Sequence, residues 1–240
     1  MYDAIRSELA PNGTLRAGIN LSNFLLVTGK NAAGDPAGVS PDMARAIANQ
    51  LGVELELVPF PNPGALADAV AENTWNIGNI GAVAERAKTI TFTSAYVEIE
   101  ATYLVPATST LQSVEDVDDP RVRIAVAERS AYGLWLEDNI RDAQLITAKG
   151  LEGSFETFTE QRLEALAGLR PRLIDDLQRV PGGRILDGKF TSVQQAIGSK
   201  PECRASAAFL QEFVEESKAN GLVASLIDKH GVKGKLTVAP

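Results

Sequence analysis

The sequence predicts an α/β protein of two lobes, the second inserted into the first. Strand-like apolar runs alternate with helix-like runs from one end of the chain to the other, which is typical of layered α/β folds. The pattern restarts after Pro106, and two helical segments close the chain. We expect those helices to pack on the first lobe. This arrangement gives a discontinuous first lobe (1–106 with 198–240), a second lobe (107–197) and two connecting strands.

In the first lobe, helices and strands have clear start and stop signals. Ser40-Pro41-Asp42 predicts a helix start, because Ser is a good N-cap, Pro suits the first helical position and an acid favours the first turn. Gly52 predicts the end of that helix. A second helix is predicted from Asn62-Pro63. The predicted strands cover 15–19, 54–58, 76–80, 90–92 and 101–105. Together they indicate a mainly parallel sheet.

The second lobe repeats this alternation on a smaller scale. Ser130 is the predicted cap of a helix that runs to Ile140. The predicted strands are 123–126, 163–167, 185–186 and 193–197, and the other predicted helices are 155–160 and 172–179. The two closing helices are predicted over 205–218 and 222–229, stopped by Asn220-Gly221 and Gly231.

Composition excludes several classes of function. The net charge of -8 and a pI near 4.8 make nucleic acids and anionic membranes poor partners. With Cys203 as the only cysteine and His230 as the only histidine, the chain cannot form an internal disulfide, a Cys-based zinc site or a well-built catalytic triad. No apolar run is long enough to span a bilayer. We expect no catalytic residues, metal or cofactor.

The first residues lack the basic-then-apolar layout of a secretory signal peptide. Either a signal segment has been removed, or the protein acts inside the cell.

Seven short motifs occur in an informative order along the chain. They are Leu15-Arg-Ala-Gly-Ile-Asn20, Gly38-Val-Ser-Pro-Asp-Met43, Leu51-Gly-Val53, Trp75-Asn-Ile-Gly78, Glu85-Arg-Ala-Lys88, Phe92-Thr-Ser-Ala-Tyr96 and Asn220-Gly-Leu-Val-Ala224. From about Leu15 to Gly231, the chain resembles the family 3 extracellular solute-binding proteins, the periplasmic amino-acid-binding components of ABC importers. The resemblance implies a type II periplasmic-binding fold, with two α/β lobes joined by a two-strand hinge. It also implies a periplasmic, monomeric protein that closes on a small carboxylate-bearing ligand and delivers it to an ABC permease.

The resemblance also assigns ligand contacts in the first lobe. Arg86 takes the place of the residue that grips the ligand carboxylate, and a planar guanidinium suits that task. Asn20 and Asn23 are expected at the end of the first strand, and the backbone of Gly81 and Ala82 at the end of another. Ligands of open α/β sheets bind outside the carboxyl ends of strands, which agrees with these positions.

The remaining candidates are Phe24 as a stacking ring, Ser130 and Tyr132 at a helix start of the second lobe, Arg170, and Gln194 on the second connecting strand. Several candidates have a plain structural alternative. Arg86 could pair with Glu85, Arg170 could be a helix-start charge near Asp175, the two Asn could cap a loop, Ser130 could be an N-cap only, and Phe24 and Tyr132 could fill core.

One departure from the family pattern concerns the ligand itself. The acid that pairs with a ligand ammonium in the family falls at Leu169 here and is followed by Arg170. A leucine cannot compensate a buried ammonium. We therefore expect an acid without a free ammonium, such as a dicarboxylate, unless Glu98 or Glu128 supplies the missing charge. Two alternatives remain open: a lyase or dehydratase on the same fold, with one of these two acids as its base, and an intracellular ligand sensor.

Overall fold

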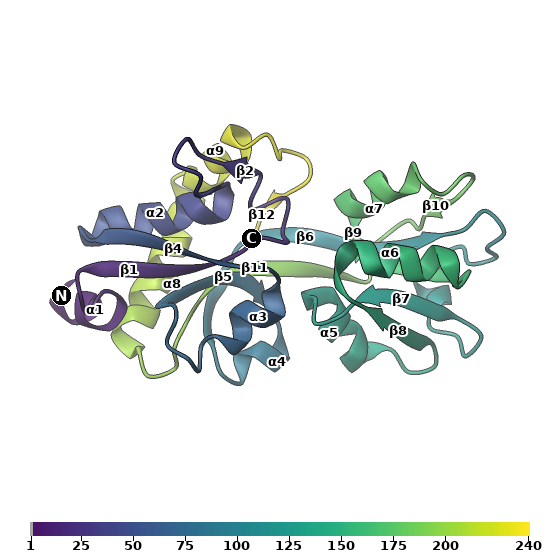
Figure 1. The fold of residues 1–240 in the computed structure, drawn as a ribbon, viewed down its shortest axis with the longest axis horizontal. Coiled ribbons are helices and arrows are strands. Elements are labelled where there is room, and N and C mark those ends of the chain that lie inside the picture. The colour runs from purple at the N-terminus through teal and green to yellow at the C-terminus, as the bar shows by residue number, and fades with distance from the viewer. Residues whose placement is uncertain (1) are drawn as a thin grey trace. The chain divides into compact units, whose positions relative to one another are not determined.

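The computed structural model describes residues 2–240, and the chain folds into two compact units (Figure 1). Unit 1 comprises the chain up to Glu98 and from Gln194 onward, and unit 2 comprises Ile99–Val193. The chain therefore passes between the units inside two long strands, β6 (Thr91–Val105) and β11 (Thr191–Ser199). The boundaries predicted from the sequence, 106/107 and 197/198, lie eight and four residues further along the chain. The two runs predicted at 90–92 and 101–105 belong, apart from Ile90, to one uninterrupted strand.

The remaining elements of unit 1 are helices and strands that mostly alternate along the chain. They are α1 (Tyr2–Leu9), β1 (Thr14–Asn20), β2 (Gly29–Lys30), β3 (Pro36–Ala37), α2 (Val39–Leu51), β4 (Glu54–Phe60), α3 (Pro63–Asp68), β5 (Ile77–Ala82), α4 (Ala84–Ala87), α8 (Arg204–Ala219), α9 (Leu222–Lys229) and β12 (Thr237–Val238). Strands β4, β1 and β5 are parallel, and β11 runs antiparallel to β5. The predicted, mainly parallel sheet is confirmed.

Helices cover both faces of this sheet. Helices α2 and α9 lie on one side and α3 on the other (Figure 1). On the α3 side, glycines in two neighbouring strands make room for the buried ring of Trp75: a Cβ atom at Gly18 would lie 3.2 Å from that ring, and one at Gly78 3.3 Å. The indole nitrogen of Trp75 donates a hydrogen bond to the Leu66 carbonyl at 2.9 Å. Small strand residues thus allow one large aromatic side chain to join the sheet to α3.

The N-terminus of α2 differs from its prediction. The N-cap is Gly38, whose φ is 156°, and Ser40 lies inside the first helical turn. A Cβ atom at Gly38 would lie 2.1 Å from the Leu26 carbonyl oxygen, so only glycine fits where the preceding loop meets the helix. The predicted Ser40 cap is therefore wrong. The predicted stop is confirmed, since Gly52 takes the left-handed conformation at φ 64°.

The closing helices pack in unit 1, α8 against α1 and α9 against α2. At the contact of α9 with α2, the Asp42 carboxylate accepts hydrogen bonds from Lys229 Nζ at 2.7 Å and His230 Nε2 at 2.8 Å. Burial acts to raise the pKa of Asp42, but the hydrogen bonds from these two residues outweigh it, and the pKa lies below its usual value. The cluster joins the N-terminus of one helix to the C-terminus of another, which matches both helix dipoles.

Asp42→Asn is therefore expected to lower the melting temperature near neutral pH and to lose this effect in acid. A carboxyl whose pKa is lowered by folding stabilises the fold above its unfolded pKa, about 3.9, and the contribution disappears as the pH falls through the folded pKa. Thermal melts of the variant and the parent protein, from neutral pH down to below the folded pKa of Asp42, test the prediction. Glu72→Gln, which removes the charge of an exposed acid, is the control. A difference between parent and variant that persists undiminished in acid would contradict it.

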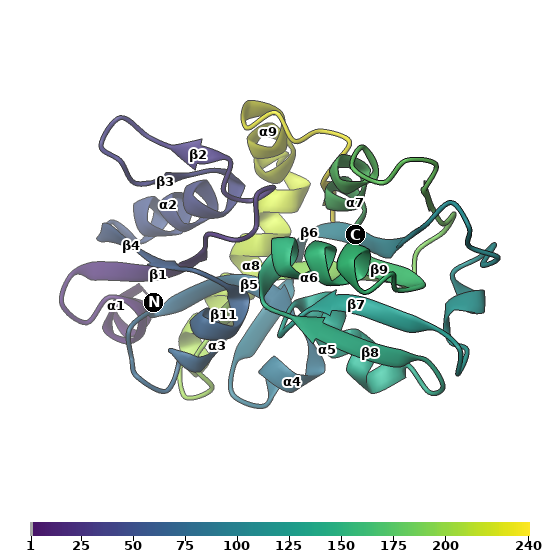
Figure 2. The ribbon, with the colours of Figure 1, turned by 45° about the vertical axis from the view of Figure 1, so that its right-hand side comes forward.

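Unit 2 contains the C-terminal half of β6, from Ile99 onward. Its other elements are a 3-10 turn (Glu115–Val117), β7 (Arg123–Ala127), α5 (Ala131–Asn139), β8 (Gln144–Ala148), α6 (Gly150–Glu160), β9 (Ala165–Leu169), α7 (Arg170–Leu177) and β10 (Arg184–Ile185). Strands β8, β7 and β9 are parallel, and β6 pairs antiparallel with β9. Figure 2 shows α6 lying across this sheet.

Two elements of unit 2 differ from the sequence prediction. Strand β8 was not predicted, because it lies at the edge of the sheet and its half-exposed residues carry no apolar alternation. Helix α6 begins five residues before the predicted Phe155, at Gly150. The core of the unit is formed by apolar residues of α6, α7, the central strands and the segment just before β9. They are Leu104, Ala125, Phe155, Phe158, Leu163, Leu166 and Leu173.

Between Tyr2 and Pro240, no helix has the length and apolar character needed to cross a membrane.

Candidate functional site

In unit 1, the carboxyl ends of two neighbouring parallel strands bring candidate residues to one edge of the sheet. Strand β1 ends at Asn20, and the adjacent β5 ends at Gly81 and Ala82. The strands are paired in register, with Ile19 opposite Asn79. This edge is where open α/β sheets bind their ligands, because the strand ends and following loops diverge there.

Arg86 lies directly beyond this edge, on the short helix α4 that follows β5. Its side chain is buried, with 5% of the residue exposed, and Nη1 donates a hydrogen bond to the Gly81 carbonyl at 2.7 Å. The neighbouring Glu85 forms an ion pair with Lys88. Arg86 is therefore not a solvated surface charge. A guanidinium held in a poorly hydrated place is a strong anchor for a carboxylate, since low local dielectric strengthens charge-assisted hydrogen bonds.

The side chains of Asn20 and Asn23 shape the turn after β1. Asn20 Oδ1 accepts hydrogen bonds from the backbone and hydroxyl of Ser22, at 3.1 and 2.8 Å. Asn23 is buried, and its Oδ1 accepts from the backbone amides of Leu25 and Leu26, at 3.2 and 3.3 Å. Phe24, which follows Asn23, is half-buried. The structure supports the loop-capping interpretation of both Asn side chains.

In unit 2, Ser130 caps α5 as predicted. Its Oγ accepts a hydrogen bond from the Gly133 amide at 3.0 Å, and the residue follows the carboxyl end of β7. Arg129, directly before it, has a positive φ of 54°, a conformation that is costly for a residue with a side chain. A Cβ atom at Gly133 would lie 2.8 Å from Ser130 Oγ, so glycine is what lets this helix start approach the strand end.

Tyr132 is a core residue rather than an exposed contact. It is 3% exposed, and burial raises the pKa of its hydroxyl to about 12, against the opposing effect of a hydrogen bond with Ser130. Trp135, on the same helix, packs against Phe190 with ring centroids 5.5 Å apart. Tyr132 and Trp135 therefore contribute to the packing of unit 2.

Arg170 is the first residue of α7, and its partner is not the predicted Asp175. Its Nε donates to Glu100 at 2.8 Å, and Nη2 donates to the Gly188 carbonyl. Leu169, the last residue of β9, is 7% exposed and offers no charge at this strand end. Glu100 is a functional candidate that the sequence did not indicate, since it reaches Arg170 only through the pairing of β6 with β9.

The structure also places Gln194, Glu98 and Glu128. Gln194, at the start of the unit 1 part of β11, donates through Nε2 to Glu98 at 2.8 Å. Glu98 is thus held by a neutral amide within unit 1. Glu128 follows β7 with an exposed side chain.

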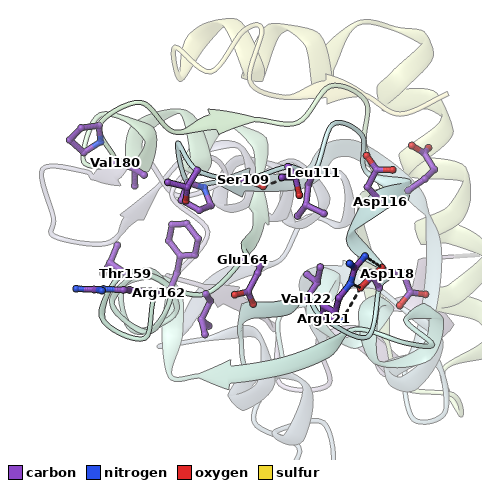
Figure 3. Close-up of a pocket in the computed structure, with 18 of the residues that line it drawn as sticks. Ser109, Leu111, Asp116, Asp118, Arg121, Val122, Thr159, Arg162, Glu164 and Val180 are labelled. Atoms are coloured by element: carbon purple, nitrogen blue, oxygen red, sulfur yellow. Dashed lines mark hydrogen bonds and ion pairs between the residues drawn. The ribbon is translucent and has the colours of Figure 1, made fainter.

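A pocket of about 920 Å³ lies wholly within unit 2, but at the amino ends of the parallel strands. Glu164, just before β9, faces into it, and Asp118 and Arg121 lie on another side (Figure 3). Two polar groups there already have protein partners. Glu164 accepts two side-chain hydrogen bonds from Arg123, at 2.8 and 2.9 Å, and Arg121 pairs with Asp119 at 2.8 Å. None of the candidate residues lines this pocket, which is at the edge opposite Ser130 and Arg170.

Among residues 2–240, no group of His, Cys, Asp and Glu side chains is arranged to hold a metal ion.

Comparison with known proteins agrees with the fold and with the order of motifs. The family model described as "Bacterial extracellular solute-binding proteins, family 3" matches residues 16–233. The chain belongs to this family. No curated protein sequence matches it significantly.

Solved structures share the fold of this family 3 protein at low sequence identity. An arginine-binding protein of T. maritima, in a mutant form, is 20% identical, with a TM-score of 0.74 over 96% of this chain and 100% of the other. The substrate-binding protein AbpA of Streptococcus pneumoniae, bound to L-arginine, is 20% identical, with a TM-score of 0.73 over 92% and 96%. An ancestral amino acid-binding protein described as a precursor of cyclohexadienyl dehydratase is 22% identical, with a TM-score of 0.71 over 93% and 97%. All three are named as binding proteins, and the type II periplasmic-binding fold is confirmed.

Proposed function

We propose that this family 3 protein is the monomeric, extracytoplasmic ligand-binding component of an ABC importer and that its ligand is a small carboxylate. The observation that carries the proposal is the buried Arg86, positioned by the Gly81 carbonyl at the carboxyl end of β5. The relatives named above as arginine-binding and amino-acid transporter proteins support the same class of ligand. Binding rather than catalysis is the expected role, and the ligand passes to a membrane permease unchanged.

In this proposal, unit 1 holds the carboxylate through the Arg86 guanidinium and the backbone of Gly81 and Ala82. The low local dielectric around the buried Arg86 strengthens these charged hydrogen bonds, and the permease recognises the ligand-bound protein.

Binding of a panel of ligands tests this function. The protein is first unfolded and refolded so that any bound solute is removed. Thermal melts and calorimetry would compare amino acids, organic acids and their neutral amides, which match the acids in size. A carboxylate present at about 100 times its Kd stabilises the folded state by about 2.7 kcal/mol, which corresponds to a rise in melting temperature of about 5–10 °C. The amide of the same acid is expected to give no shift. Equal binding of acid and amide, or binding of uncharged solutes alone, would contradict the proposal.

A further inference from the structure

The pocket at the amino ends of the unit 2 strands combines an apolar middle with an acidic end. Figure 3 shows Asp116 and Asp118 at one end, Thr159 at the opposite end, and Leu111 and Val122 between them. Further apolar side chains line the same space: Pro106, Phe158, Leu163, Val180 and Pro181. Every lining residue belongs to unit 2, so the pocket is complete within that unit. A molecule with an apolar body and one charged end would match both kinds of surface.

Acidic side chains outnumber basic ones around this pocket. Five of the lining residues are acids and three are arginines. Two of the acids are neutralised within the protein, since Glu164 pairs with Arg123 and Asp119 pairs with Arg121. Three lining acids have no Lys, Arg or His within ion-pair distance in the part of the chain from Tyr2 onward: Glu115, Asp116 and Asp118.

Backbone amides hold two of these acids in place without neutralising them. Asp116 Oδ2 accepts hydrogen bonds from the amides of 112 and 113, at 2.8 and 2.9 Å, and these bonds lower its pKa. Asp118 Oδ1 accepts from the amides of 141–143, at 3.1, 2.8 and 2.9 Å. Burial acts to raise the pKa of Asp118, but these amide bonds, with a smaller effect from the charge of Arg141, outweigh it. Both carboxylates are therefore ionised and oriented at neutral pH.

The arrangement of charges favours an organic cation with a single charge. Within residues 2–240, no group of acidic side chains converges as a metal site requires. Arg121 and Arg179 are paired with acids, whereas Arg162 is exposed and lies beside Thr159, at the end of the pocket away from Asp116 (Figure 3). A second ammonium group at that end would be repelled by Arg162. A monoamine is thus preferred over a diamine.

We propose that this pocket is a second binding site of the protein and that it takes a small aliphatic amine with one ammonium group. The ammonium donates charge-assisted hydrogen bonds to Asp116 and Asp118, and the hydrocarbon chain packs on Leu111 and Val122. The inference goes beyond the proposed function and does not rest on it, because the pocket lies wholly in unit 2 and its ligand needs no carboxylate.

Calorimetry with hexylamine, 1-hexanol and 1,6-diaminohexane tests this inference. The double variant Asp116→Asn with Asp118→Asn keeps an acceptor oxygen for the backbone amides and removes both charges. It is expected to weaken hexylamine binding by about 5- to 25-fold, since each partly hydrated ion pair contributes up to about fivefold. Binding of 1-hexanol is expected to stay within about twofold. Glu137→Gln is the matched control, because it removes an exposed acid of the same unit that does not line the pocket.

Melting temperatures show whether the variants fold, and 1-hexanol binding is a second readout on the same samples. The inference is overturned by equal binding of hexylamine and 1-hexanol, by tighter binding of the diamine, or by no hexylamine binding at millimolar concentration. Hexylamine affinity that is unchanged in the double variant, or equally reduced in Glu137→Gln, also overturns it. Arg86→Gln is expected to bind hexylamine like the parent protein, so loss of carboxylate binding in that variant bears on the proposed function alone.

Discussion

Replacing Arg86 by glutamine is expected to weaken binding of the ligand by about 100-fold or more. Truncating one partner of a buried, hydrogen-bonded charge pair costs about 2–5 kcal/mol, because the remaining charge is left desolvated and unpaired. Arg86 meets the conditions for an effect of this size, since it is 5% exposed and is held by the Gly81 carbonyl at 2.7 Å. Calorimetric titration of the best ligand from the panel measures the loss.

Two further variants separate the role of Arg86 in binding from its role in folding. Arg86→Lys keeps the charge but loses the planar fork, so it is expected to recover only part of the affinity. Lys88→Gln removes a cation two residues away that pairs with Glu85 at the surface, and it is expected to bind like the parent protein. If Arg86→Gln melts like the parent and binds the ligand equally well, Arg86 is not the carboxylate anchor.

Replacing Trp75 by alanine is expected to destabilise unit 1 by about 3–5 kcal/mol, the usual cost of removing a fully buried large aromatic side chain. Trp75 is 0% exposed and lies in a core cluster with Leu66, Ile80 and Ile90. Its ring fills the space that Gly18 and Gly78 leave open on the sheet. Because protein interiors are closely packed and relax only in part, repacking recovers only a fraction of such a loss. Urea unfolding followed by circular dichroism measures the change.

Trp75→Phe serves as the conservative comparison. It keeps an aromatic ring but loses the hydrogen bond to the Leu66 carbonyl, and it is expected to cost less than the alanine variant. Trp135 is the only other tryptophan and belongs to unit 2, so its fluorescence reports on that unit in both variants. A loss of less than about 1 kcal/mol in Trp75→Ala would show that the ring is not a main element of this core.

Local features were predictable from the residues alone because their causes lie within a few positions. Ser130 caps α5 through an amide three residues ahead, and Gly52 ends α2 in its own left-handed conformation. The ordered motifs led to the family, and with it to Arg86 as a candidate. The same local logic failed at Ser40, because the space beside Gly38 is limited by the Leu26 carbonyl of a preceding loop, which no helix signal records.

The sequence by itself determined the fold class, most strands and helices, and the candidate at Arg86. Only the tertiary structure decided that β6 is one strand carrying the boundary between the units, and that Arg170 pairs with Glu100, seventy residues away. The physical reason is that hydrophobic periodicity and capping signals report the surroundings of a residue along its own segment. The partner of a charged side chain depends instead on which strands pair and in what register, here Ala101 of β6 opposite Leu169 of β9.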